Sequence, residues 1–383
     1  MGVHISSPED LWTRSGVVAV HISSPEDLWT RVGYRGRQLV RRWPVDRARA
    51  ARQIRDDLPM TSPATEGAAR PFDPNKPFTR AEALNGGLTV RQLRGRDVVR
   101  LFRNVYISRS VTRTIAVRAK AALLIAPEGA VISHHTAALL WRGTVPDTSA
   151  VHVTIGHKQT FDVPGIRTHR YLRVPKGFQH NGIRLTSPER TFADLAEFLD
   201  LVQLVTLGDR LVRREVTTPA RLMQFARNWD RPRYALIRRA ALFVREGVDS
   251  PPESRLRMLV VLAGLPDPVV NLILRDPVTG DWQRRFELAY EELLVAIEYE
   301  GRHHREKDDV WANDIERRED LDRRTWRVIQ VISDGLYKHP LRTLQRVEQA
   351  RLDRGARPTG GFREEWRSFY PGKDSSPGPQ VLT

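Results

Sequence analysis

Residues 285–304 constrain the fold of this chain more than any other stretch, because two apolar runs there carry acidic residues where buried strands normally exclude them. The runs flank a short polar turn and alternate as the two strands of a hairpin do. A turn centred between Glu292 and Leu293 places Glu287 directly opposite Glu298. Opposed like charges are destabilising, so another interaction must offset the repulsion between these carboxylates.

A bound divalent cation would offset this repulsion. Strand alternation puts Glu300 on the same face as Glu298, so three carboxylates meet on one patch of the sheet. Mg²⁺ prefers oxygen ligands and commonly takes one or two carboxylates together with waters and a substrate phosphate. The pattern therefore predicts a Mg²⁺ (or Mn²⁺) site. The alternative is a set of structural acids neutralised by Arg284, Arg285 or Arg302.

An acid ends the first run, an acid-x-acid-Gly motif ends the second, and a His follows. In these motifs, and over roughly 252–351, the chain resembles the PD-(D/E)XK nuclease superfamily, most closely the very-short-patch-repair-like endonucleases and a related family of unknown function. The resemblance implies a restriction-endonuclease-like mixed sheet flanked by helices and a Mg²⁺-dependent phosphodiesterase site. Glu287 would match the metal-binding Asp, Glu298 and Glu300 the second acidic motif, and His304 a His near the scissile phosphate. Glu300 stands where the superfamily's catalytic Lys would be.

Glu253 lies near the start of a helix expected over 253–263. It is either a fourth carboxylate of the site or an acid that stabilises the helix dipole.

The formal net charge of +16 favours a polyanionic partner, because Lys and Arg neutralise phosphates and release counterions. Most of the basic residues are Arg, however, which a coding bias explains equally well. We expect nucleic acid, specifically DNA, as the partner, and no membrane.

The region after residue 70 opens with two capping-box signatures, Thr79 with Glu82 and Thr89 with Gln92, followed by a strand pair over 98–107. This order matches a winged helix, and over most of 75–215 the chain resembles AbiEi-family antitoxins, which are repressor-like DNA binders. A winged-helix unit used only for packing is the alternative. The resemblance implies DNA contacts from a recognition helix and a wing, made by Arg91, Gln92, Arg94, Arg100 and Arg103.

The middle of the chain alternates between helices and strands. Adjacent His134 and His135 suggest a metal site, but neighbouring helical residues point about 100° apart, so solvated or capping histidines are expected. Arg190 and Asp194 are spaced for a surface ion pair on a helix that starts at Thr186. Helices are expected over 115–125 and 133–141, and strands over 151–155, 165–172 and 182–185.

The length of 383 residues predicts more than one domain, and the order of helices and strands predicts a multidomain α/β protein. The absence of cysteine, of a signal peptide and of a membrane-length apolar run indicates a cytoplasmic protein. Residues 3–14 recur identically as 20–31, which we interpret as a tandem duplication. The expected divisions are a flexible extension (1–70), a winged-helix-like unit (71–110), an α/β and helical middle region (111–248), a nuclease-like domain (249–355) and a disordered tail (356–383).

The sequence leaves the function open between an enzyme and a binding protein. The first possibility is a DNA-directed, Mg²⁺-dependent endonuclease, in a toxin–antitoxin or defence context. The second is a non-catalytic transcriptional repressor or antitoxin with a degenerate nuclease fold. Acids kept at 287, 298 and 300 argue against complete loss of the site.

Overall fold

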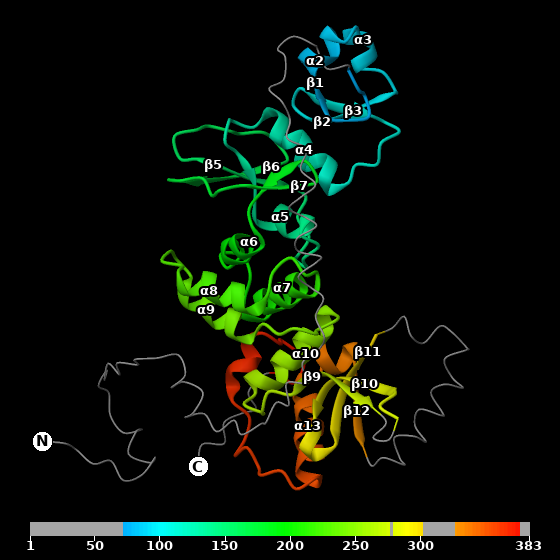
Figure 1. Cartoon of the computed structure of the whole chain (residues 1–383), viewed down its shortest axis with the longest axis vertical. Coiled ribbons are helices and arrows are strands. Elements are labelled where there is room, and N and C mark those ends of the chain that lie inside the picture. The colour runs from blue at the N-terminus through cyan, green and yellow to red at the C-terminus, as the bar shows by residue number, and fades with distance from the viewer. Residues whose placement is uncertain (1–71, 276–278, 302–325, 376–383) are drawn as a thin grey trace, which may run out of the picture. The chain divides into compact units, whose positions relative to one another are not determined.

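The computed structural model describes residues 72–275, 279–301 and 326–375 (Figure 1). Three sheets and the helices between them make a mixed α/β fold, as the sequence predicts. The expected extension 1–70 with its duplication lies outside the described residues.

The first sheet is small and three-stranded, with strand order β1-β3-β2. Both predicted capping boxes are confirmed: in the first, the Glu82 amide donates to Thr79 Oγ1 at 3.2 Å and the Thr79 amide to Glu82 Oε2 at 2.7 Å. A separate core of Phe78, Ala83 and Leu93 holds these elements together. They are β1 (Phe78–Thr79), α2 (Arg80–Asn85), α3 (Val90–Leu93), β2 (Val98–Phe102) and β3 (Val105–Ser108).

The second sheet has five strands in the order β6-β5-β4-β8-β7, with β5 and β6 parallel. Val151, Val153 and Ile155 of β5 pack in one core with alanines of α4. The alternating His152 and Thr154 are buried as well, so both faces of this strand are covered. The elements are α4 (Ile115–Ile125), β4 (Val131–Ile132), α5 (His134–Leu140), β5 (Val151–Gly156), β6 (Ile166–Tyr171), β7 (Phe178–His180) and β8 (Ile183–Leu185).

A helical region follows, and here the expected helix start and ion pair need correction. Ser187, not Thr186, is the N-cap, and its hydroxyl accepts from the Arg190 amide at 3.1 Å. The Arg190–Asp194 pair (2.7 Å) is buried, not on the surface, because Tyr171 and Trp229 cover it. The helices are α6 (Pro188–Leu195), α7 (Leu201–Arg213), α8 (Pro219–Arg227), α9 (Tyr234–Phe243) and α10 (Pro251–Leu262).

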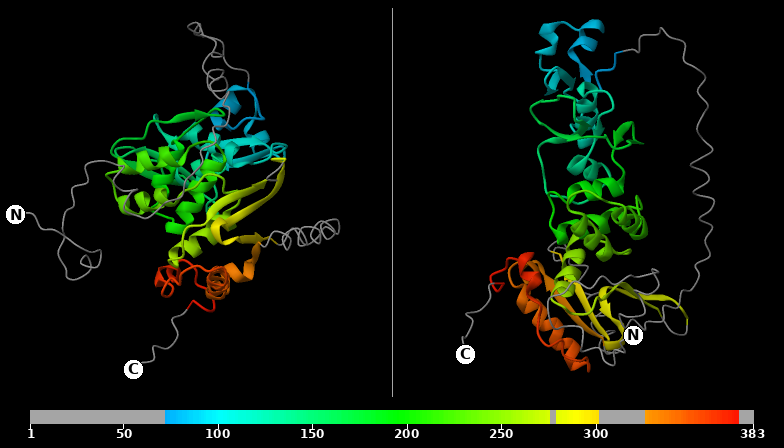
Figure 2. Two further views of the ribbon diagram at one scale, coloured as in Figure 1. Left: turned by 60° about the horizontal axis from the view of Figure 1, so that its bottom comes forward. Right: turned by 90° about the vertical axis from the view of Figure 1, so that its left-hand side faces the viewer.

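The third sheet is four-stranded and mixed, in the order β12-β11-β10-β9, and only its β11–β12 pair is parallel. Helices α10 and α13 contact it, and the largest core of the described residues joins them to one face of the strands (Figures 1 and 2). The elements after α10 are β9 (Val269–Arg275), β10 (Trp282–Tyr290), the 3₁₀ turn η3 (Glu291–Leu293), β11 (Val295–Glu300), β12 (Arg327–Ile332), α12 (Ser333–Tyr337), α13 (Pro340–Asp353) and the 3₁₀ turn η5 (Glu364–Ser368).

The expected disordered tail is wrong for residues 356–375. Trp366 is fully buried and Tyr370 nearly so, both in the core that includes α10. The Tyr370 hydroxyl donates to the Arg255 carbonyl at 2.5 Å, and Glu365 pairs with Arg239. Two aromatic side chains thus anchor a segment whose Gly and Pro content predicts disorder.

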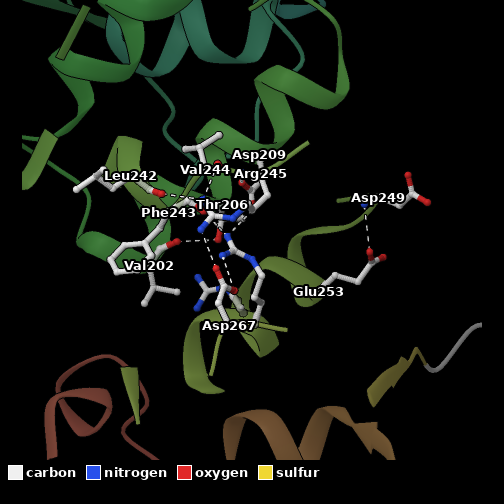
Figure 3. Close-up of polar contacts among 12 residues, drawn as sticks. Val202, Thr206, Asp209, Leu242, Phe243, Val244, Arg245, Asp249, Glu253 and Asp267 are labelled. Carbon is white, nitrogen blue, oxygen red and sulfur yellow. Dashed lines mark hydrogen bonds and ion pairs between the residues drawn. The ribbon is translucent and has the colours of Figure 1, made fainter. Parts of the chain in front are cut away.

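A buried arginine joins the helical region to the segment that leads into β9. Arg257 of α10 is fully buried, and its guanidinium lies 3.5 Å from Asp209 of α7 and 3.5 Å from Asp267. It also donates to the Phe243 carbonyl at 2.5 Å. Figure 3 shows Asp209, Phe243 and Asp267 close together, with Arg245 as a further link: its amide donates to Asp209 and its guanidinium to Asp267.

Gly208 of α7 lies where a neighbouring chain segment approaches closely. A Cβ there would lie 2.4 Å from Val244 Cγ2 and 3.1 Å from the Phe192 ring. Gly208→Ala should therefore destabilise the protein by about 1–3 kcal/mol, although Gly→Ala normally favours a helix interior. Thermal or urea unfolding measures the change. An unchanged or higher stability would mean that Val244 moves aside at no cost.

Across the described residues, no helix combines the length and the apolar character that crossing a bilayer requires.

Candidate functional site

The predicted hairpin register is confirmed. Leu288 pairs with Ile297, Ala289 with Ala296 and Tyr290 with Val295, and the turn carries Leu294 at φ 53°. This ladder ends at Leu288 and Ile297. Beyond that point β10 continues beside β9 and β11 beside β12.

Glu287 is the first residue of β10 past the end of this ladder. Its carboxylate accepts a hydrogen bond from the Tyr299 amide of β11 (2.7 Å). Beyond the end of the ladder, β10 and β11 are thus linked by a side chain and not by backbone pairing. Glu298, the residue opposite Glu287 in the same register, lies just beyond the point where pairing stops. The two carboxylates predicted to face each other therefore lie where the sheet divides.

A local kink in β9 and β10 accompanies this division. Val270 and Leu272 are two residues apart on β9 yet pack in different cores, which a regular strand does not permit. Asn271 between them has φ 49°, and its side-chain nitrogen and oxygen are buried without a hydrogen-bond partner. Phe286 and Leu288 of β10 are likewise two residues apart and pack in two different hydrophobic cores. Irregularities of this kind redirect side chains next to functional sites.

Arg284 neutralises Glu298. Its Nη2 lies 3.1 Å from Oε1 and 3.0 Å from Oε2 of Glu298, and both side chains are about one-fifth exposed. The guanidinium also lies 4.9 Å from the centroid of the Phe286 ring. Arg285 points to a different acid, Asp249, at 2.5 Å. Of the arginines expected to neutralise these acids, Arg284 therefore does so for Glu298, and Arg302 lies outside the described residues.

The charge on Glu287 is disfavoured. Burial is the main cause, the negative charges of Glu253 and Glu298 add to it, and together they raise the pKa of Glu287 to about 8. The Tyr299 amide and Arg285 oppose the shift. A carboxyl group that burial and neighbouring acids keep from ionising is typical of sites that bind a cation.

Glu253 lies in the first turn of α10, as expected for an acid that stabilises the helix dipole. It is 5% exposed, and its carboxylate accepts from the Asp249 amide at 3.1 Å, while Ser250 is the N-cap of the helix. Burial raises its pKa as well, and it is near enough to Glu287 to raise the pKa of that residue. Glu253, Glu287 and Glu298 thus form one electrostatic group.

The carboxylate oxygens of these acids are farther apart than the ligand atoms of a bound metal ion. Among the described residues, the acidic side chains do not form a group of three with ligand atoms within 4.8 Å of one another. Glu300 is half-buried two residues beyond Glu298 and pairs with Ile332 in the parallel ladder. His304 lies outside the described residues.

The residues expected to contact DNA lie in the first sheet and its helices. Arg91, Gln92, Arg94, Arg100 and Arg103 are all exposed. Gln92 caps α3 with its side-chain oxygen, and the Arg100 Nε donates to the Phe102 carbonyl at 3.2 Å. Helix α3 has four residues, so it offers a short surface for base contacts.

Sequence reasoning missed a histidine cluster. His134 is the first residue of α5 and has a left-handed backbone (φ 49°). Together with His152 of β5 and His169 of β6 it brings three ring nitrogens within 4.8 Å of one another. His134 is fully buried, so the expectation of a solvated histidine is wrong, and His135 is also buried. The parallel β5–β6 pairing sets Thr154 against His169, which places His152 and His169 on one face.

The imidazoles of this cluster are neutral at neutral pH. Burial is the main cause, with added repulsion from neighbouring cations and imidazoles; it lowers the pKa of His152 to about 3 and that of His169 to about 4. The pKa values of His134 and His135 are lowered for the same main reason. Neutral imidazole is the form that binds metal ions.

No protein-family model matches this chain, and none of the curated proteins matches it.

Proposed function

We propose that this protein is a Mg²⁺-dependent nuclease acting on DNA, with its site where β10 and β11 separate. The observation that carries this proposal is the placement of Glu287 and Glu298 at the end of their shared ladder, with Glu253 close by. Grouped carboxylates at the opening of a mixed sheet suit a hard cation and the phosphate that it binds.

Glu287, Glu298 and Glu300 would hold the ion. When bound, it would polarise a phosphodiester and lower the pKa of an attacking water. Glu253 adds negative charge behind Glu287, and the Tyr299 amide fixes one oxygen of Glu287. Arg284 would have to release Glu298 for a cation, and it then lies where a cationic group can approach a substrate phosphate.

Incubation with plasmid, single-stranded DNA and RNA, in Mg²⁺, Mn²⁺ or chelator, tests this proposal. We expect metal-dependent cleavage of DNA, and loss of cleavage in chelator. Cleavage that persists in chelator, or none of any substrate with either metal, would exclude the proposed function.

The pKa of Glu287 leads to a pH dependence of metal binding. Below a pKa of about 8 the carboxyl is protonated, so a cation must displace the proton. Apparent Mn²⁺ affinity should rise about tenfold for each pH unit up to about 8 and then level off. Mn²⁺ titrations between pH 6 and 9 measure this slope, and Glu287→Gln should remove it. A flat profile in the wild type would place the metal elsewhere.

A second candidate function is DNA binding without cleavage, as in a repressor or antitoxin. The Arg284–Glu298 pair, in which Nη2 of Arg284 reaches both carboxylate oxygens, favours it, because a structural ion pair alone explains the presence of that acid. Fluorescence anisotropy with duplex DNA tests binding through its salt dependence. Arg91→Ala with Arg94→Ala should weaken binding and lower the salt slope by about two. Tight, salt-sensitive binding without cleavage would favour this function over the first.

A further inference from the structure

We propose that His134, His152 and His169 bind a divalent transition-metal ion, with Zn²⁺ as the natural candidate. Their ring nitrogens lie within 4.8 Å of one another, and they come from α5, β5 and β6. None of these residues belongs to the carboxylate site. The proposal is independent of nuclease function.

The spacing needs little adjustment to hold an ion. His152 Nδ1 and His169 Nε2 are 3.0 Å apart. Nitrogens at about 2.0–2.1 Å from a tetrahedral Zn²⁺ lie roughly 3.3–3.4 Å from each other. The N···N distance therefore has to grow by only a few tenths of an ångström, and both rings must also turn so that each nitrogen directs its lone pair at the ion in place of their direct hydrogen bond.

An unpartnered nitrogen of His134 supports the same conclusion. Its Nδ1 lies 2.9 Å from Ser133 Oγ, which in turn accepts from Thr154 Oγ1 at 2.8 Å. Its Nε2 is buried without a hydrogen-bond partner among the described residues, which is unfavourable for a polar atom. If Nδ1–H donates to Ser133, Nε2 carries a free lone pair. Metal-binding histidines are commonly oriented by such a bond from the other ring nitrogen.

The donor set decides the class of metal. Three neutral imidazoles suit Zn²⁺, Co²⁺ or Ni²⁺, whereas Mg²⁺ and Ca²⁺ require oxygen ligands. The ring of His134 stacks on that of His169 with centroids 3.6 Å apart and an interplanar angle of 13°, so one of the two rings must tilt for both to bind a single ion. Phe198 packs edge-on against both. Three protein ligands leave a fourth position for a water or another donor.

Two arginines lie near the cluster and oppose a cation. Arg190 is tied to Asp194 at 2.7 Å, and Arg167 lies over the Phe198 ring at 5.3 Å. The Asp194 carboxylate offsets the charge of Arg190. Arg167 is exposed to solvent, so water and salt screen its repulsion of a bound cation.

Metal analysis and Co²⁺ spectroscopy of the full-length chain test the site. We expect about one Zn²⁺ per chain after dialysis against a slight excess, and intense visible bands from four-coordinate Co²⁺. His134→Asn removes the imidazole while keeping a residue that tolerates a positive φ. This change should weaken binding by more than the roughly 10–100-fold that loss of an outer-shell partner costs.

His157→Asn is the matched control, because His157 is exposed at the end of β5. It should keep the metal and the spectrum, as should Glu287→Gln at the other site. A wild-type protein that takes up no Zn²⁺ and gives only the pale spectrum of octahedral Co²⁺ would overturn the proposal. So would a folded His134→Asn variant with undiminished binding. Circular dichroism shows whether the His134→Asn variant is folded. If it is unfolded, the Co²⁺ spectrum of the wild type decides whether the proposed site binds metal.

Discussion

Glu298→Gln should reduce Mg²⁺-dependent DNA cleavage by more than about 100-fold. Glutamine keeps the shape of the side chain but removes the negative charge that a cation requires. The Arg284 pair is weakened by the same change, so the free energy of unfolding should also fall, by about 1 kcal/mol at most for a partly exposed pair. Cleavage rates on plasmid DNA, with folding checked by thermal unfolding, measure both effects.

Glu292→Gln provides the control for this result. Glu292 is exposed in the turn between β10 and β11, so the variant has the same change in net charge on the same hairpin. Its cleavage rate should match that of the wild type. Equal activity in Glu298→Gln would show that the carboxylate serves only Arg284.

Arg257→Met should destabilise the protein by about 3–5 kcal/mol. The cost arises because Asp209, whose pKa burial raises, would remain fully buried without its cationic partner. The Phe243 carbonyl would lose its donor at the same time. Urea unfolding gives the change in free energy.

Adding Asp209→Asn to Arg257→Met should recover part of this loss, because the stranded charge is then removed. Arg255→Met on the same helix is the control; Arg255 lies over the Tyr337 ring, and its loss should cost about 1 kcal/mol or less. A double variant less stable than Arg257→Met would show that Asp209 is stabilised by groups other than Arg257.

Local features were predictable from the sequence. The capping boxes at Thr79 and Thr89 and the register of the β10–β11 hairpin follow from residues a few positions apart, and the structure has all three. The Arg190–Asp194 spacing correctly predicted a contact. It could not predict burial, because Tyr171 and Trp229, which cover the pair, lie far away in the sequence.

Non-local features were not predictable. His152 and His169 meet only because β5 and β6 pair in parallel and α5 covers the polar face of β5. The residues of that strand alternate between apolar and polar, yet both of its faces are buried. A usable signal was the presence of His152 and His169 in two neighbouring predicted strands, with His134 at the start of the predicted helix before them. Trp366 and Tyr370 likewise indicate burial within a segment whose composition predicts disorder.

The proposed carboxylate site lies between these two cases. The register of its hairpin followed from the sequence, but the end of the ladder at Leu288 and the irregular backbone at Asn271 did not. Those two features decide where the Glu287 side chain points. They depend on packing against two different cores, which periodicity alone does not reveal.

Direct counting of bound Mn²⁺ by electron paramagnetic resonance tests the central claim most directly. The His134→Asn variant is the suitable background, because it removes the histidine site from the count. Bound Mn²⁺ should be present at about one ion per chain in this background, and should be lost when Glu287→Gln or Glu298→Gln is added. Mn²⁺ binding that neither glutamine changes would contradict a metal site between β10 and β11.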